Sequence, residues 1–375
     1  MSRILYIIDG YYPNVWWSET LFQYLAEGMF KAWHEVNILT LHTPKSDKQY
    51  SIHNKVFIHR IKSMRVAFVF FGLNKALQLA RNADIIHTST YASAPLARLV
   101  AKLLHKKVVI TIHEPYHKLR FHFLSWVSAR AAYCRENLVC KLSYDHYIAP
   151  SLYTMNSIRL LYGKNDNKVS LIYHGIDYEN WDKNRFTIEE IQTLRKQLGL
   201  QEKIVWLYFW RSGVGKGCID LIYSVSHIIK QIPNFVCLMI LAYTPEWPKT
   251  KIEQLVVELG IQKHIVLHDS VAYKELPKYV LSSNMTIVPS HAEWFGFAAA
   301  EVCGLDHPLV VSQIASLPEV VSGKVVFCQP NNPESIANAV VNMYQWHYIL
   351  IDKKKFEWEQ CIHTHLDLYK KLQWK

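Results

Sequence analysis

The sequence predicts an α/β protein built from two doubly wound parallel sheets. Short apolar runs alternate with stretches of helical periodicity along the whole chain. Apolar runs of this kind are typical of parallel strands that are buried on both faces. A chain of 375 residues is too long for one ordinary core, so two domains are expected. In such sheets, ligands bind at the carboxyl ends of the strands.

In the first half of the chain, strands and helices are expected to alternate from residue 3 onward. A loop over 11–18 follows the first strand, and apolar residues recur at helical spacing over 19–30. His113 ends one of the strands, at the edge of the sheet that lines the ligand crevice, so it is a candidate site residue. The strands expected in this half are 3–8, 34–40, 56–60, 84–88, 108–113 and 147–149.

A polar connection from about 174 to 202 is expected to hold the hinge between the domains, with a helix over 188–198. The second half then repeats the alternation of strands and helices. Its expected strands are 204–209, 235–241, 265–267, 285–288, 308–311 and 324–327, and its expected helices include 218–229, 333–345 and about 352–372.

Two loops of the second half carry charges suited to a phosphorylated sugar ligand. Arg211 and Lys216 lie between a strand and a helix, where each can meet a different phosphate oxygen. Glu293 and Glu301 flank the start of an expected helix, whose N–H groups and dipole favour an anion. Carboxylates beside such a site suit the hydroxyl groups of a sugar or ribose.

Taken in order, these motifs resemble the GT-B glycosyltransferases of retaining family 4. His174-Gly-Ile-Asp177 also resembles a turn of this family, with His174 in place of asparagine. The motifs that carry the resemblance are Arg211-x4-Lys216-Gly217, Glu293-x7-Glu301 around Phe295-Gly296-Phe297, Pro308-Leu-Val-Val-Ser312 and Leu317-Pro-Glu-Val-Val321.

The resemblance implies two Rossmann-like domains that face an interdomain cleft. Residues 1–174, with a C-terminal helix at about 352–375 packed back on them, would bind the acceptor. Residues 175–350 would bind a UDP- or GDP-linked sugar. The implied reaction moves the sugar to an acceptor hydroxyl with retention, and it needs no cofactor besides the donor. Since no Asp-x-Asp occurs in the chain, no metal site is expected.

The resemblance also implies roles for single residues. Arg211 and Lys216 would meet the leaving diphosphate, where negative charge develops. Glu293 would hold a sugar hydroxyl, and Glu301 the ribose. His113 would orient the donor sugar. Backbone N–H groups of Phe295, Gly296 and Phe297 would bind the sugar and phosphate, and the loop at Trp16 and Trp17 would approach the diphosphate.

Positive charge is concentrated in the first half. Residues 1–174 hold 22 Lys and Arg against 10 Asp and Glu. One interpretation is a bias toward solubility; the other is an anionic membrane surface as partner, because basic residues are mixed with apolar ones. Nucleic acid is not expected, since no known binding motif accompanies the charge. The basic and apolar segments are Lys55, Arg60, Lys62 and Arg65 before 66–71, then Arg98, Lys102, Lys106 and Lys107, then Arg130 and Arg135 after 121–126.

Compartment follows from the cysteines and from the opening residues. Seven scattered cysteines without Cys-x-x-Cys indicate reduced thiols. No signal peptide opens the chain and no apolar run reaches membrane-spanning length. A cytoplasmic protein is therefore expected, at most peripheral on the inner face of the membrane.

Tryptophan stands where the family has glycine, namely at Trp16, Trp17, Trp33, Trp210 and Trp294. Glycine serves close backbone approach or positive φ, and tryptophan rarely does either. The chain has 13 glycines and 12 tryptophans, a glycine share about half of the usual roughly 7%. One hypothesis is that UGA codons that mean glycine were translated as tryptophan; the alternative is that the tryptophans are real.

Two other functions stay open. If the tryptophans are real, the protein is a glycosyltransferase-like binding protein whose donor pocket they fill. A GT-B enzyme of other chemistry, such as a phosphorylase or a nucleotide-sugar epimerase, is the second alternative. The joint presence of Arg211, Lys216, Glu293 and Glu301 argues against both.

Overall fold

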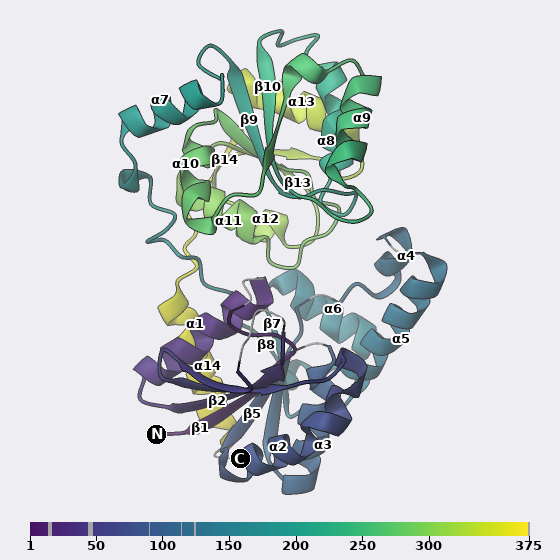
Figure 1. Ribbon diagram of the computed structural model, residues 1–375, viewed down its shortest axis with the longest axis vertical. Helices are drawn as coiled ribbons and strands as arrows, with labels where there is room; N and C mark the ends of the chain where they lie inside the picture. The colour runs from purple at the N-terminus through teal and green to yellow at the C-terminus, as the bar shows by residue number, and fades with distance from the viewer. Residues whose placement is uncertain (14–16, 44–47, 90, 114, 124, 374–375) are drawn as a thin grey trace. The chain divides into compact units, whose positions relative to one another are not determined.

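The computed structural model describes residues 1–13, 17–43, 48–89, 91–113, 115–123 and 125–373. The chain divides into two compact units (Figure 1): one is Met1–Gly175 together with Phe356–Lys375, and the other is Ile176–Lys355. Each unit is a mostly parallel sheet with helices packed against it. The prediction of an α/β fold with two domains is confirmed.

The sheet of the first unit is wound in both directions from its first strand. β1 pairs with β2 on one side and with β5 on the other, both in parallel. The described strands follow the order β3-β4-β2-β1-β5-β6-β7-β8, and only β3 runs antiparallel to its neighbour among them. These strands are β1 (Arg3–Ile7), β2 (Glu35–Leu41), β3 (Tyr50–His53), β4 (Val56–Ile61), β5 (Ile85–Ser89), β6 (Lys107–Thr111), β7 (His146–Ala149) and β8 (Val169–Leu171).

Helices connect these strands, and the last helix of the chain belongs to the same unit. The Tyr369 hydroxyl of that helix lies 2.5 Å from Nδ1 of His87 and 3.4 Å from the hydroxyl of Tyr6, which ties it to β5 and β1. It begins at Trp358, so the predicted helix over 352–372 was six residues too long at its start. The helices are α1 (Trp17–Lys31), η1 (Arg65–Ala67), α2 (Phe68–Asn82), α3 (Ser93–Leu104), η2 (His117–Leu119), α4 (Arg120–Phe123), α5 (Trp126–Lys141), α6 (Leu152–Tyr162), η3 (Asp166–Lys168) and α14 (Trp358–Gln373).

The sheet of the second unit is also doubly wound. β9 lies between β10 and β12, and the described strands follow the order β11-β10-β9-β12-β13-β14-β15, with β15 antiparallel to β14. Its strands are β9 (Ile204–Arg211), β10 (Phe235–Ala242), β11 (Ile265–Asp269), β12 (Met285–Val288), β13 (Leu309–Ser312), β14 (Gly323–Cys328) and β15 (Ile349–Ile351).

Two α-helices of the second unit, α7 and α13, begin at side-chain caps. At the start of α7 the Glu190 amide donates to Oγ1 of Thr187, and the Thr187 amide donates to the Glu190 carboxylate. This reciprocal pair satisfies two amides that the first turn leaves open. The helices are η4 (Lys183–Arg185), α7 (Ile188–Gln197), α8 (Cys218–Ile228), α9 (Lys249–Glu258), η5 (Gln262–His264), η6 (Tyr273–Glu275), α10 (Leu276–Leu281), α11 (Phe297–Gly304), α12 (Leu317–Val320) and α13 (Pro333–Tyr344).

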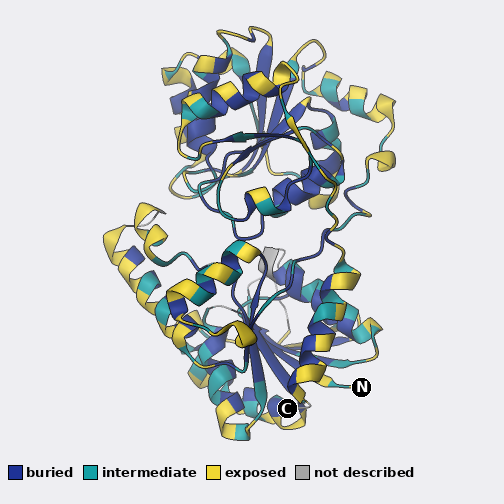
Figure 2. Cartoon of the chain, turned by 180° about the vertical axis from the view of Figure 1, so that it is seen from behind, coloured by how far each residue is buried: buried dark blue, intermediate teal, exposed yellow. Residues whose placement is uncertain are grey.

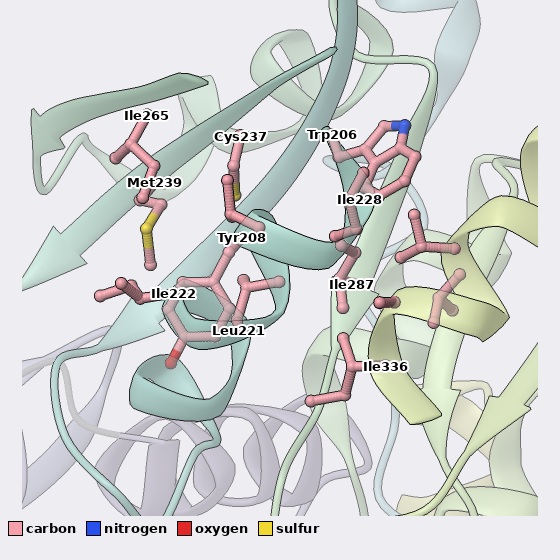
Figure 3. Packing of buried hydrophobic residues seen from close by; sticks show 14 of the residues in the cluster. Trp206, Tyr208, Leu221, Ile222, Ile228, Cys237, Met239, Ile265, Ile287 and Ile336 are labelled. Atoms are coloured by element: carbon pink, nitrogen blue, oxygen red, sulfur yellow. The ribbon is translucent and has the colours of Figure 1, made fainter. Parts of the chain in front are cut away.

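The cores form along the strands of each sheet. Figure 3 shows the core of the second unit, in which Trp206 and Tyr208 of β9 lie among aliphatic side chains of the neighbouring strands and helices. The Trp206 ring packs 4.3 Å from that of Phe235. In Figure 2 the strands are buried, whereas the outward faces of the helices are exposed. All seven cysteines are free thiols, and six of them are buried.

Three features differ from the sequence predictions. The short edge strands β3 and β15 were missed: β3 lacks a continuous apolar run, and β15 is only three residues long. Arg60 was assigned to a basic surface, yet it is buried. Its guanidinium donates to the carbonyl of Tyr12 and to Oγ of Ser51, so it ties β4 to β3 and to the loop after β1.

Candidate active site

The middle of the second sheet is where its winding direction reverses. β9 and β12 are parallel neighbours there, although the chain visits β10 and β11 between them. In sheets of this kind, ligands bind near the loops that follow two such strands, at the carboxyl ends of the strands. Lys216 lies on the loop after β9, and Glu293 on the loop after β12.

Lys216 and Glu293 form an ion pair between these two loops. The Lys216 Nζ lies 2.7 Å from Oε1 of Glu293, and the two side chains are only 20% and 13% exposed. Ser290 donates a further hydrogen bond of 3.0 Å to the same oxygen. Because the pair is largely removed from water, each charge depends on the other. The two residues that the sequence assigned to diphosphate and sugar are therefore adjacent.

Arg211 ends β9 and is exposed. Its carbonyl accepts a 2.9 Å hydrogen bond from the hydroxyl of Tyr208, which lies 3.4 Å from the carbonyl of Lys216. Burial raises the pKa of Tyr208 well above its usual range, so this hydroxyl keeps its proton. Tyr208 thus fixes both ends of the loop that carries the two cations.

The two loops touch backbone to backbone at Gly217. This residue has a φ of +70°, and a Cβ there would lie 1.9 Å from the carbonyl oxygen of Pro289. Only glycine permits this approach. The His291 amide also donates to the carbonyl of Gly215, and the His291 Nε2 lies 2.5 Å from Oδ2 of Asp220. The sequence analysis missed the His291 and Asp220 contact, because nothing in their spacing pairs residues 71 positions apart.

The helix α11 begins beside this contact. Gly296 precedes it with a φ of +93°, and Phe295 and Phe297 pack edge to face with ring centroids 4.9 Å apart. A Cβ on Gly296 would lie 2.9 Å from the Leu317 side chain. No hydrogen bond from a side chain caps this N-terminus within the described residues. Its dipole and first-turn amides suit an anion.

Glu301 lies in the second turn of α11 and is buried. The Tyr273 hydroxyl donates to its Oε1 at 2.8 Å and in turn accepts from the Trp181 indole N–H at 2.8 Å. Burial raises the pKa of Glu301 to about 7, with the nearby Asp177 carboxylate adding to the rise and the Tyr273 hydrogen bond opposing it. Near neutral pH, this carboxyl is therefore poised between its two forms.

Trp210 and Trp294 occupy the same region. The Lys216 Nζ lies 5.2 Å from the centre of the Trp210 ring, and Trp294 is buried. Together with Lys216, Glu293 and Ser290, the Trp210 side chain lines a cavity of about 10 Å³. A volume of this size holds about one water molecule.

Both halves of the chain match known families. Residues 18–180 match the model for Glycosyltransferase Family 4, and residues 190–345 match that for Glycosyl transferases group 1, so the two models together cover most of the chain. The chain belongs to the GT-B glycosyltransferases. It is an enzyme of the type that acts on nucleotide sugars.

Individual relatives are distant but similar over nearly their whole length. An uncharacterized glycosyltransferase of Methanocaldococcus jannaschii is 24% identical over 368 residues, which span 92% of both chains. The alpha-monoglucosyldiacylglycerol synthase of Acholeplasma laidlawii is 24% identical over 326 residues, 82% of this chain and 80% of that protein. The fold matches HepE of Anabaena in complex with UDP-glucose with a TM-score of 0.78 and 16% identity, over 99% of this chain and all of that one.

In the first unit of this glycosyltransferase, His113 follows β6 at the carboxyl edge of the sheet. Its ring lies 6.1 Å from that of Phe22 and 5.7 Å from that of His174. Burial lowers the pKa of His113 to about 3, so the imidazole is neutral. Trp17 is the first residue of α1, and Trp16 lies outside the described residues.

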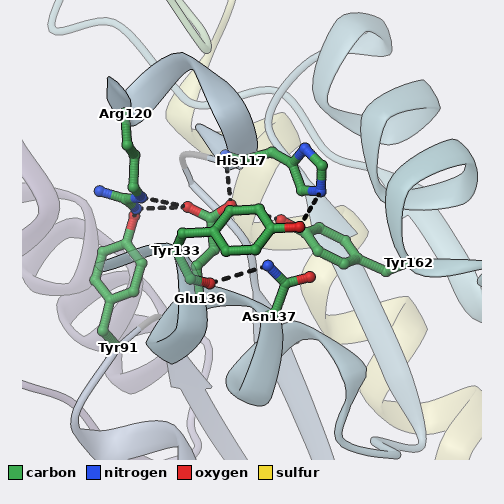
Figure 4. A network of polar contacts seen from close by, with 7 residues as sticks. All are labelled: Tyr91, His117, Arg120, Tyr133, Glu136, Asn137 and Tyr162. Carbon is green, nitrogen blue, oxygen red and sulfur yellow. Dashed lines mark hydrogen bonds and ion pairs between the residues drawn. The ribbon is translucent and has the colours of Figure 1, made fainter. Parts of the chain in front are cut away.

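A buried carboxylate that the sequence analysis missed anchors the loops of the first unit. Glu136 of α5 accepts from the Arg120 guanidinium, from the His117 amide at 2.6 Å and from the Tyr162 hydroxyl at 2.7 Å (Figure 4). Arg120 also donates to the Tyr91 hydroxyl. The network therefore ties the loops after β5 and β6 to α5 and α6. Nothing in the sequence distinguished this glutamate from a solvated one.

Basic residues of the first unit gather at two surfaces. Lys62 and Arg65 are exposed and shortly precede α2, in which Phe70 and Phe71 are 79% and 67% exposed. The other surface is a hollow of about 570 Å³ near the amino ends of β6 and β7. Its basic lining residues are Arg98, Lys102, Lys106, Lys107, Lys168 and Lys371.

The described residues contain no cluster of three or more His, Cys, Asp or Glu that could hold a metal ion. None of their helices is long and apolar enough to cross a membrane.

Proposed function

We propose that this glycosyltransferase is a retaining enzyme that transfers a sugar from a UDP- or GDP-linked donor to an acceptor hydroxyl, without a metal ion or a further cofactor. The observation that carries the proposal is the meeting of Lys216 and Glu293 at the switch point of the second sheet. At this position a cation, a carboxylate and a helix N-terminus lie close together, so phosphate and sugar can both be bound there.

The charge that develops on the leaving diphosphate is the largest electrostatic demand of the step. Arg211 can meet one phosphate as a fork, and Lys216 another as a point charge. When the diphosphate takes Lys216, the Glu293 carboxylate is released to accept from a sugar hydroxyl. The amides of 295–297 add to this field. Glu301 would hold the ribose, since its buried carboxylate gains from hydroxyl donors.

The first unit would supply the acceptor side and His113. A neutral imidazole can donate to one sugar oxygen and accept from another group without bringing a charge. The Glu136 network keeps the loops after β5 and β6 in place around an acceptor. We take the acceptor to be lipid-linked or a growing surface polysaccharide. The lipid glycosyltransferase among the relatives supports this choice.

The acceptor would be reached at the inner face of the cytoplasmic membrane. The patch of Lys62, Arg65, Phe70 and Phe71 combines cations with exposed aromatic rings, as segments at anionic membrane surfaces do. The basic hollow lacks such exposed aromatic rings among its lining residues.

The test is turnover of UDP-glucose and GDP-mannose by the purified protein, with excess EDTA. Release of nucleoside diphosphate in EDTA, together with an axial product linkage by proton NMR, supports the proposal. Lys216→Met should lower turnover at least 100-fold, whereas Lys230→Met in the exposed turn after α8 should leave it unchanged. Loss of all turnover in EDTA, or an inverted linkage, would contradict the mechanism.

A second function is favoured by one observation. Trp210 leaves a cavity of only about 10 Å³ beside Lys216 and Glu293, too small for a diphosphate. On this alternative the protein is a catalytically inactive binding protein. Nucleotide-sugar binding by calorimetry without turnover, or neither, would support it over the first.

A further inference from the structure

Two helices of the second unit end in the same way, and both use glycine. α7 is followed by Gly199 with a φ of +67°, and α9 by Gly260 with a φ of +66°. The Gly199 amide donates to the carbonyl three residues back, and the next amide donates to the carbonyl five residues back. The amides at and after Gly260 repeat both bonds. This is the Schellman arrangement, in which the left-handed residue is usually glycine because it has no Cβ.

Two further helices end with the same bonds, but tryptophan occupies the left-handed position. Trp33 follows α1 and Trp346 follows α13, each with a φ of +63°. The Trp33 amide donates to the carbonyl of residue 30, and the next amide to that of residue 29. The Trp346 amide donates to the carbonyl of residue 343, and the next amide to that of residue 342. All four positions therefore have a similar positive φ and the same pair of backbone hydrogen bonds.

Tryptophan suits neither position. Its Cβ crowds the backbone in the left-handed region, where asparagine, aspartate and histidine are the usual exceptions to glycine. The gain from burying an indole is also missing, because Trp33 is 86% exposed and Trp346 is 70% exposed. The contacts of the Trp346 ring are made at the surface: the Nζ of Lys324 lies 5.0 Å from its centre, and the Tyr348 ring lies 6.3 Å away.

Other tryptophans of the chain have the burial and ring contacts that are usual for this residue. Trp181 is 1% exposed and its indole N–H donates to the Tyr273 hydroxyl. Trp358 stacks on Tyr24, with ring centroids 4.4 Å apart and an interplanar angle of 7°. Trp358 also contacts Gly175 closely enough that a Cβ there would clash with its ring. The chain therefore contains two kinds of tryptophan.

We infer that residues 33 and 346 are glycine in the natural protein, because their codons in its gene are UGA and the genetic code of its source reads UGA as glycine. Glycine at both positions matches the backbone, removes two exposed indoles and raises the low glycine share of the chain. Residue 346 is an independent case, since it belongs to no phosphate or sugar motif.

The same inference applies to the tryptophans of the candidate active site and its loops, and this part rests on the proposed function. Residues 16, 17, 210 and 294 are then glycine as well. Removing the Trp210 ring enlarges the cavity next to Lys216, which gives a diphosphate room beside its cation. The binding-protein alternative loses its supporting observation.

The deciding measurement is the codon at each tryptophan position in the native gene, with peptide mass spectrometry of the protein from its natural source. We expect UGA and glycine at 33, 346 and 210, and UGG and tryptophan at 181 and 358. UGG at 33 and 346 overturns the inference. UGA at 181 and 358 also overturns it, because UGA codons would then not coincide with the left-handed backbone positions.

Stability provides a second measurement. In the recombinant chain, Trp33→Gly and Trp346→Gly should each raise the melting midpoint by about 2–4 °C. The matched control Trp181→Gly should lower it, since it removes a buried ring and a hydrogen bond. Unchanged or lower midpoints for both surface variants count against glycine at these positions. The codons do not depend on activity: if they are UGA and the Trp210→Gly protein still binds no nucleotide sugar, the proposed function fails while this inference stands.

Discussion

The affinity of the enzyme for its donor should depend on pH through Glu301. This carboxyl is buried, and its pKa of about 7 without donor means that it is about half protonated at neutral pH. A ribose diol donates more strongly to the carboxylate than to the acid, so binding favours the charged form. Affinity should therefore be constant above about pH 8 and fall as the pH drops below 7, by up to about tenfold per unit, or 1.36 kcal/mol.

Titration calorimetry with UDP-glucose between pH 5.5 and 8.5 measures this dependence. A nucleotide sugar is the right probe, because its diphosphate is esterified at both ends and does not titrate in this range. Glu301→Gln should weaken binding about 10–100-fold at pH 8, as for a lost bond to a charged group, and should abolish the pH dependence.

Two neighbours should move the midpoint in opposite directions. Tyr273→Phe removes the hydrogen bond that lowers the pKa of Glu301, so the midpoint should rise. Asp177→Asn removes a carboxylate that raises it, so the midpoint should fall. An affinity that stays within twofold from pH 6 to 8, or shifts of the same sign in both variants, refutes the role assigned to Glu301.

Three further predictions concern the pair, the histidines and the membrane. Lys216→Met should lower the free energy of unfolding by about 3 kcal/mol, because Glu293 keeps a poorly solvated charge. The double variant with Glu293→Gln should recover most of this loss. If urea unfolding shows no recovery, Lys216 and Glu293 are not a coupled pair. Burial lowers the pKa of His113 to about 3 and of His365 to about 4, from 6.5. Below about pH 6.5 the unfolded chain therefore binds more protons than the folded one. The free energy of unfolding should decrease as the pH is lowered from about 6.5 to 4, by roughly 1.4 kcal/mol per unit for each histidine. Melting at pH 7.5, 6 and 5 tests this, and His365→Gln should lessen the slope by one histidine. In sedimentation with phosphatidylglycerol vesicles, Phe70→Ser with Phe71→Ser should release the protein, whereas Lys102→Glu in the basic hollow should release it less; equal release would contradict the patch on α2.

Much of the fold could be predicted because its signals are local. β12 coincides with the predicted strand 285–288, since four consecutive buried residues, three of them apolar, end there at a proline. Arg211, Lys216 and Glu293 were found because each follows a central strand, and the topology then brings the loops together. The edge strands β3 and β15 could not be found, because each is short and pairs on one side only, which leaves it partly exposed.

Contacts between distant residues explain what else was missed. Arg60 was assigned to the surface from its charge, yet its guanidinium is satisfied by groups at residues 12 and 51 that no local pattern identifies. Glu136 gathers donors from three other segments of the first unit, and its sequence neighbours look like an ordinary exposed helix face. Such partners are set by packing and not by spacing.

The two loops of the candidate site constrain which residues they can hold. A carbonyl of the β12 loop lies where the Cβ of residue 217 would be, so the loops meet without side chains between them. That closeness brings Lys216 to 2.7 Å from Glu293. On the proposed function a diphosphate binds at Lys216, and the centre of the Trp210 ring lies 5.2 Å from the Lys216 Nζ. A tryptophan at 210 then competes with the substrate for room, whereas a glycine there leaves the contact at Gly217 in place.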